Sequence, residues 1–389
     1  MKFLRTLSTS RLVLLIVAVV ALAAGGAAIA VAASGGSGPT PPPKPLAQAL
    51  HDSLAGQAPE GVTARIKFTN KLFPSGAITG QVGSALMSGA SGRLWATNDG
   101  RGRLELQSDA GDVQIVWNDT EVTVFDASSN TVYRAKLPAH AKSSGDQSGI
   151  PSVTKISDFL GKLGEHVSLS GAEPSNVAGQ EAYTVRVSPR HDGGLLGAAK
   201  IAFDASRGVP LRLGIYAQGA STPVLELAAT DITYGSVPAS DVEVTPPAGA
   251  KTVDLGSLTR NAKAAQSGRV RVTGLKSVQA AASFPVVAPD RLVGLPRQDV
   301  RLVGNSDKAA LVVYGHGLGA IVVVERQAGA GGNNGAMGSL PQVSLNGVTA
   351  HELATQLGTV LTWKRGGVAY VLAGSVPPAA AEAAARGLG

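Results

Sequence analysis

"DVQIVWNDTEVTVFDASSNTVYRAKLP" occupies residues 112–138 and shows the pattern from which much of the chain is built. Apolar residues stand at every second position in "DVQIVW", a pattern typical of a strand with one buried face. Turn-forming residues follow at 118–119 and again at 128–130. Connections this short join only antiparallel neighbours, so the stretch predicts three consecutive strands of an antiparallel sheet.

The same alternation recurs on both sides of this stretch. In "VTARIKFT" (62–69), the apolar residues share one face and Thr, Arg and Lys share the other. Further strands are expected in "RLELQ" (103–107), "AYTVRVS" (182–188), "AKIAFDASRGVPLRLGIYA" (199–217) and "PVLELAATDITYG" (223–235). An open, twisted sheet of about nine or more strands tends to curl, which gives it a concave and a convex face.

Two segments have helical spacing instead. "KPLAQALHDSLAG" (44–56) predicts a short helix that ends at Gly56. "SVTKISDFLGKLG" (152–164) predicts an amphipathic helix between the two groups of strands, with Gly164 at its end. We expect this second helix to cover the concave face as a lid, through Ile156, Phe159, Leu160 and Leu163. The alternative is an ordinary helix-on-sheet core without a cavity.

A hollow between the sheet and this lid helix would be apolar. The larger apolar side chains of the predicted strands are the candidates for its lining, although the sequence does not show which of them face it: Ile66, Phe68, Leu104, Leu106, Ile115, Trp117 and Phe125. Burial of each methylene group contributes about 0.8 kcal/mol, so part of an acyl chain in such a groove could bind usefully.

The N-terminus predicts a membrane segment. Residues 1–11 carry Lys2, Arg5 and Arg11 and no acidic residue, and residues 12–33 are uncharged, about the length needed to cross a bilayer. Positive charge before the span predicts a cytoplasmic N-terminus and an extracytoplasmic body. "AVA" at 30–32 leaves a cleaved signal peptide open as an alternative, which would give a secreted protein, but the long apolar run favours an anchor. Residues 34–45 are rich in Gly, Ser and Pro and predict a linker.

Composition and motifs argue against several classes of function. The net charge is +7, but the positive residues are scattered and lack neighbouring aromatics, so nucleic acid is not an expected partner. The chain has no cysteine, which excludes disulfides and thiolate chemistry. "HELAT" (351–355) lacks the second His of a zinc protease, and "YGHGLG" (314–319) joins two strands rather than opening a helix. We therefore expect a protein that is not an enzyme and has no metal or cofactor.

A second unit is expected over residues 268–389, after a linker at 256–267. "KAALVVYGHGLGAIVVVERQAG" (308–329) and "TVLTWKRGGVAYVLAGSV" (359–376) predict hairpins, the latter turning at Gly366–Gly367. "VTAHELATQLG" (348–358) predicts a short helix, and "PPAAAEAAARGL" (377–388) predicts another, with proline at its start and Gly387 at its end. These features indicate a small α+β domain that contacts a partner.

Three segments of the first unit resemble one family. They are "VWNDTEVTVFDASSNTVYRAKLP" (116–138), "AFDASRGVPLRLGIYA" (202–217) and "DITYGSVPASDVEVTPPAGAKTVDL" (231–255). These strand and turn motifs are similar to those of the LolA-like lipoprotein-carrier superfamily, which includes RseB-type sigma-factor regulators and actinobacterial membrane-anchored relatives. The resemblance covers roughly residues 45–255. "LTWKRGGVAYVLAGSV" (361–376) and the last helix resemble a small C-terminal domain of unassigned function.

The resemblance implies a fold and two functions. The fold is α+β, with a curved antiparallel half-barrel sheet capped by helices over residues 46–255, plus a smaller C-terminal α+β domain. The first function is a membrane-tethered protein that binds lipid or lipoprotein acyl chains in an apolar cavity, as a carrier or a sensor. The alternative is an RseB-type regulatory module that binds a transmembrane anti-sigma factor or another envelope partner. A purely structural envelope module is a third possibility.

Overall fold

The computed structural model describes residues 38–72, 85–137, 151–191, 194–254, 272–304, 308–329 and 340–388. The chain divides into two compact units, with the main boundary between Ser257 and Leu258. The predicted membrane segment at 12–33 and the whole linker at 256–267 lie outside the described residues. In the part of the chain that is described, no helix has the length and apolar character needed to span a bilayer.

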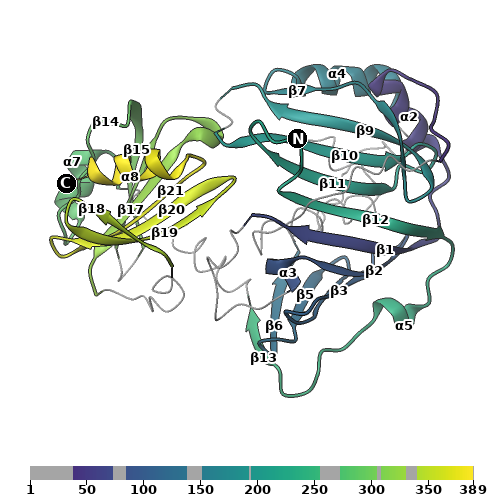
Figure 1. Cartoon of the computed structure of the whole chain (residues 1–389), viewed down its shortest axis with the longest axis horizontal. Helices are drawn as coiled ribbons and strands as arrows, with labels where there is room; N and C mark the ends of the chain where they lie inside the picture. Colours follow the sequence, from purple (N-terminus) through teal and green to yellow (C-terminus); the bar gives the residue numbers. More distant parts are fainter. Residues whose placement is uncertain are drawn as a thin grey trace. The chain divides into compact units, whose positions relative to one another are not determined.

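The first unit is built mostly from strands, with a few helices among them (Figure 1). Its helices are α2 (Leu46–Ala55), α3 (Ala85–Ser88), α4 (Val153–Leu163) and α5 (Ala239–Val242). Its strands are β1 (Gly61–Asn70), β2 (Ala90–Thr97), β3 (Gly102–Gln107), β4 (Val113–Trp117), β5 (Glu121–Asp126), β6 (Thr131–Lys136), β7 (Val167–Leu169), β8 (Glu173–Val177), β9 (Gln180–Pro189), β10 (Leu196–Asp204), β11 (Pro210–Ala217), β12 (Leu225–Tyr234) and β13 (Lys251–Asp254).

These strands form one curled sheet of 13 strands among the described residues, in the order β13-β6-β5-β4-β3-β2-β1-β12-β11-β10-β9-β7, with β8 paired to β9. Strands β1–β6 follow one another as a meander, and so do β9–β12. The two meanders join where β1 pairs with β12, a contact visible in Figure 1. The neighbouring pairs are antiparallel except β13–β6, which is parallel. The expected α+β fold with a curved antiparallel half-barrel is confirmed.

The alternation in the sequence explains how the sheet divides into two faces. In β1, Val62, Ala64, Ile66 and Phe68 are buried, whereas Arg65 and the other intervening residues are exposed. Side chains of successive strand residues point to opposite faces, so one face of β1 is apolar and the other is polar. The register carries this division to the neighbours, because Ala64 pairs with Leu94 on β2 and with Ile232 on β12.

Residues 38–45, which we call the strap, lie against the first unit although they fall in the predicted linker. The side-chain amide of Asn176 donates a 2.9 Å hydrogen bond to the carbonyl of Pro39, and the hydroxyl of Tyr183 donates one of 2.6 Å to the carbonyl of Pro42. Lys44 forms an isolated bridge with Ala172. The strap is therefore a fixed part of the folded unit.

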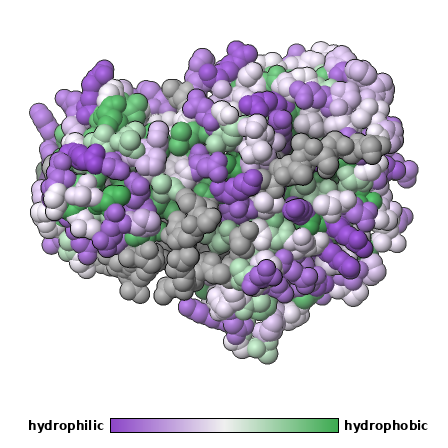
Figure 2. All heavy atoms as spheres, in the orientation of Figure 1, coloured by the Kyte–Doolittle hydropathy of each residue, from purple (hydrophilic) through white to green (hydrophobic). Residues whose placement is uncertain are grey.

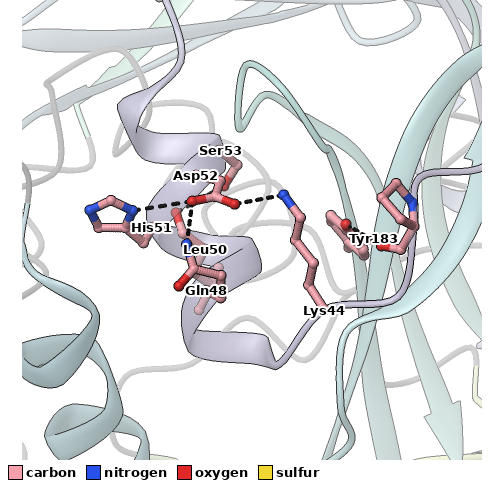
Figure 3. A network of polar contacts seen from close by, with 8 residues as sticks. Lys44, Gln48, Leu50, His51, Asp52, Ser53 and Tyr183 are labelled. Carbon is pink, nitrogen blue, oxygen red and sulfur yellow. Dashed lines mark hydrogen bonds and ion pairs between the residues drawn. The ribbon is translucent and has the colours of Figure 1, made fainter.

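The strap leads into α2 through a polar network at the first turns of that helix (Figure 3). The ammonium group of Lys44 lies 2.6 Å from one carboxylate oxygen of Asp52, and the amide of Gln48 donates a 2.6 Å hydrogen bond to the other. The ring of His51 lies 3.3 Å from the same carboxylate. Asp52 thus holds the strap against α2.

The second unit contains an eight-stranded sheet in the described residues, ordered β14-β15-β16-β17-β21-β20-β19-β18. Its strands are β14 (Arg291–Leu292), β15 (Leu295–Val303), β16 (Ala309–Tyr314), β17 (Ile321–Gln327), β18 (Gln342–Leu345), β19 (Val348–Thr355), β20 (Gly358–Arg365) and β21 (Val368–Gly374). Helices α7 (Leu275–Ala281) and α8 (Pro378–Arg386) pack on a core of its own, and a short 3-10 helix spans Gly317–Gly319. The expected smaller α+β domain is confirmed.

Most of the elements predicted for this unit are present. Both hairpins form, and Gly366 and Gly367 turn the second one with positive φ angles of 56° and 76°. Helix α8 starts at Pro378 and has Gly387 as its C-cap, as expected.

The helix predicted over 348–358 is wrong, because these residues form β19 and its turn into β20. Strand β19 has a neighbour on each side, β18 and β20, so two ladders of backbone hydrogen bonds outweigh the local helix preference of Ala, Glu and Leu.

Candidate functional site

The apolar face of the first sheet contains a small, partly open hollow at its centre. The volume of the hollow is about 60 Å³, and its walls come from β1, β2, β12 and the residues of and just before β11. The lining residues are apolar with one exception, Arg212: Val62, Ala64, Ile66, Leu94, Val209, Pro210, Leu211, Arg212, Leu213, Leu227, Ala229 and Ile232. The site therefore offers hydrocarbon and almost no polar group to a ligand.

Small residues at the centre of the sheet explain why space remains here. Ile66 pairs with Gly92 on one side and with Ala229 on the other. Gly92 is required by a close approach, since a Cβ atom at this position would lie 1.8 Å from the carbonyl oxygen of Glu105. A large side chain is thus absent on both flanks of Ile66, and the apolar face is locally indented.

A β-bulge lies beside the hollow. The register between β1 and β12 shifts between Arg65, which pairs with Asp231, and Ile66, which pairs with Ala229, so Thr230 is the additional residue. The hydroxyl of Thr230 donates a 3.3 Å hydrogen bond to the carbonyl of Arg65. A bulge bends its strand and increases the local twist, which here helps to curve the sheet around the hollow.

Six of the seven residues predicted to line a cavity share the apolar face. Their register partners connect them across β1, β3 and β4, and their exposed fractions run from 1% to 5%: Ile66, Phe68, Leu104, Leu106, Ile115 and Trp117. Of these, Ile66 lines the hollow. Phe125 lies on the opposite face, because it pairs with Gln114, which points away from Val113 and Ile115. It cannot line the same site.

The predicted lid helix corresponds to α4. Ser152 caps its N-terminus and Ile156 is fully buried, whereas Phe159, Leu160 and Leu163 are less deeply buried. None of these apolar residues lines the hollow.

Helix α4 packs beside α2. Leu46, Ala49 and Leu50 of α2 already cover part of the sheet, where they pack around Tyr183 and Phe203.

The polar face of the same sheet carries charged and aromatic side chains in contact. The guanidinium of Arg103 lies 5.0 Å from the ring centre of Trp95 and forms an ion pair with Glu105, which also accepts a 3.2 Å hydrogen bond from Gln114. This face is therefore suited to solvent. On the side shown in Figure 2, hydrophilic residues are widespread and apolar residues form separate small patches.

The described residues show no arrangement that indicates catalysis. No group of three or more His, Asp or Glu side chains that could hold a metal is present among them. His351 of the "HELAT" motif lies on a strand, with its ring 3.2 Å from the carbonyl of Leu340. The motif therefore has neither the helix nor the second histidine that a zinc protease requires.

Comparisons with proteins of known structure found similar chains. One is described as the complex structure of Pseudomonas aeruginosa MucA/MucB; it is 17% identical, covers 87% of this chain and 94% of its own, and superposes with a TM-score of 0.41. A second, an uncharacterised conserved protein from Thermus thermophilus, is 11% identical over 53% of this chain and 97% of its own, with a TM-score of 0.32.

A third is a putative outer membrane lipoprotein-sorting protein domain from Vibrio parahaemolyticus, 10% identical over 51% of this chain and 95% of its own, with a TM-score of 0.24. No protein-family model and no curated sequence matches the chain.

Proposed function

We propose that the protein is a non-enzymatic, membrane-tethered envelope protein that binds the end of an acyl chain on the apolar face of its first sheet. The hollow around Ile66 carries the proposal, because its lining is apolar and it lies at the junction of the two meanders. Residues 12–33 would supply the tether and keep both units outside the cytoplasm.

The size of the hollow sets what it can hold. Its volume of about 60 Å³ is smaller than the roughly 150 Å³ of an apolar cavity that binds benzene. Only a few methylene groups would enter, and four of them would contribute about 3 kcal/mol. Tighter binding requires that the hollow widens or that the rest of the chain lies along the neighbouring apolar strands.

The experiment uses a matched pair of substitutions on adjacent residues of β12. Ala229 lines the hollow, whereas Ala228 pairs with Lys67 and points to the polar face, and both are half-buried. Ala229→Leu is expected to weaken binding of a fluorescent fatty acid to the full-length protein about tenfold or more, and Ala228→Leu to change it less than about twofold. Organic extraction of the purified protein followed by mass spectrometry would identify the natural lipid.

Two results would count against the proposal. One is a protein that carries no extractable lipid and does not bind the fatty acid. The other is equal weakening by Ala229→Leu and Ala228→Leu, which would show that the substitutions act on the fold rather than on the hollow.

The second unit favours an additional role as a regulatory interaction module. It folds around its own core and contributes no residue to the hollow. We propose that it binds a membrane regulatory protein, with the acyl chain as the signal that the first unit detects. Loss of capture of that partner when residues 272–389 are deleted, with fatty-acid binding retained, is the expected result.

A further inference from the structure

The turn between β14 and β15 is strained. Leu292 pairs with Leu295, so Val293 and Gly294 form a two-residue turn, and both have positive φ angles, 44° and 84°. Such type I′ turns favour Asn-Gly or Asp-Gly. A β-branched residue in the left-handed region is a conformational outlier, and outliers of this kind occur most often at functional sites.

The side chain at this strained position is also unusually exposed. Among the described residues the most exposed large apolar side chains are Leu318 at 55%, Val293 at 45% and Val303 at 37%. Leu318 lies in the turn between β16 and β17, within the 3-10 helix Gly317–Gly319. Two of the three are therefore turn residues with aliphatic side chains directed to solvent.

The two turns are neighbours at one end of the second sheet. Strand β15 pairs with β16, and the amide of Gly315 donates a 2.9 Å hydrogen bond to the carbonyl of Pro296. The start of β15, which follows Val293, thus adjoins the end of β16, which precedes Leu318. Val303 pairs with Ala309 at the other end of β15, away from both turns.

Cationic and titratable groups flank these side chains. Arg291 is exposed, and its guanidinium donates a 3.1 Å hydrogen bond to the carbonyl of Gly294, which holds the positive charge beside Val293. His316 is exposed in the other turn. Asp290 is the nearby carboxylate, and its charge is offset by Arg297 at 2.7 Å.

We propose that these two turns, which we call the paired tips, insert Val293 and Leu318 into the surface of a lipid bilayer that contains anionic headgroups. Both side chains stand on exposed turns, a form suited to insertion into a fluid apolar medium. A guanidinium held beside an inserted aliphatic side chain can remain at headgroup level and interact with anionic lipid. This surface is independent of the hollow in the first unit.

The absence of cysteine allows a direct test on the full-length protein. Leu318→Cys and, as the matched control, Val303→Cys each introduce one thiol for an environment-sensitive fluorophore. With the protein reconstituted in vesicles of phosphatidylglycerol and phosphatidylcholine, the label at 318 is expected to shift to shorter emission wavelength and to be quenched by spin-labelled lipid. The label at 303 is expected to behave as in water.

A second pair of variants tests the strained turn. Val293→Asn fits the type I′ turn better than valine, so the fold is expected to be retained or stabilised. In the Leu318→Cys background it is expected to reduce lipid quenching of the label several-fold, whereas Val303→Asn is expected to leave quenching unchanged.

Three outcomes would overturn the proposal. They are equal signals from positions 318 and 303, equal insertion into vesicles made only of phosphatidylcholine, and a shift that appears on native membranes but not on protein-free vesicles. The last would assign the paired tips to a protein partner instead.

Discussion

The hydroxyl of Tyr183 on β9 donates a 2.6 Å hydrogen bond to the carbonyl of Pro42, and so fastens the strap to the first sheet. Tyr183 is 2% exposed, so this bond is shielded from water. Tyr183→Phe is expected to lower the free energy of unfolding by about 1–2 kcal/mol, because the carbonyl of Pro42 loses its partner. Urea denaturation measures the change, and Tyr133→Phe, at a half-buried tyrosine, is the control.

The Lys44–Asp52 ion pair should make the stability of the first unit depend on pH in the acid range. The hydrogen bond from Lys44, with a further one from His51, lowers the pKa of Asp52 to about 2. A carboxyl with a depressed pKa stabilises the fold above its unfolded value near 3.8, and this stability is lost as pH falls towards 2. Because the pair is partly exposed, the effect should stay below about 1 kcal/mol. Denaturation at a series of pH values should show a shallower acid slope for Asp52→Asn; an unchanged slope would contradict the assignment.

Glu325 should make the stability of the second unit depend on pH in the opposite direction. Its side chain is fully buried on β17, where one oxygen accepts a 2.9 Å hydrogen bond from the amide of Val287. The other oxygen has no hydrogen-bond partner among the described residues. Burial raises the pKa of Glu325 to about 7. The folded state therefore holds a proton that the unfolded state releases from about pH 4.5 upward.

Stability of the second unit should accordingly fall as pH rises from about 4.5 to 7 and then level off, by on the order of 3 kcal/mol. Glu325→Gln keeps an oxygen for the amide of Val287 and removes the titration, so its stability should vary less over this range and exceed that of the wild type at pH 8. Thermal unfolding measured at pH 5 and pH 8 distinguishes the two proteins. A variant less stable than the wild type at pH 8 would show that the carboxylate is better accommodated than its burial suggests.

A side chain at position 102 should cause a steric clash on the apolar face of the first sheet. A Cβ atom at this position would lie 2.1 Å from the ring of Trp117, which packs directly on the backbone of β3. Gly102→Ala is expected to displace the ring and to cost about 1–3 kcal/mol. Gly171→Ala is the matched control, since a Cβ atom there would meet no atom within 4 Å. Tryptophan fluorescence and urea denaturation should change for the first variant and remain nearly constant for the second.

Many strands of both units could be predicted because they carry a signal of their own. The alternation in "VTARIKFT" corresponds to β1 and that in "DVQIVW" to β4, and residues of both lie on the apolar face as the period of two requires. Turn residues at 118–119, 128–130 and 366–367 marked the hairpin ends for the same local reason. Local patterns of this kind survive folding because antiparallel neighbours are also neighbours in sequence.

The features that failed or were missed depend on how strands pair rather than on the pattern within one segment. "VTAHELATQLG" has a helical composition, but pairing with β18 and β20 makes it a strand. Phe125 is out of phase with Val122 and Val124, and the register with β4 places it on the face opposite to Ile115. The hollow itself arises from Gly92 and Ala229, which flank Ile66 from strands far apart in the sequence, so no local signal could have located it.

The pairing of β1 with β12 has a consequence for biosynthesis. Val62 meets Tyr234, its partner, only after nearly the whole first unit has left the ribosome, whereas β2 to β6 can assemble as they emerge. A large share of long-range contacts slows folding. In the partly folded chain, before β12 is available, the unpaired edge of β1 promotes aggregation. We therefore expect the nascent chain to need protection by a chaperone until β12 arrives to complete the centre of the sheet.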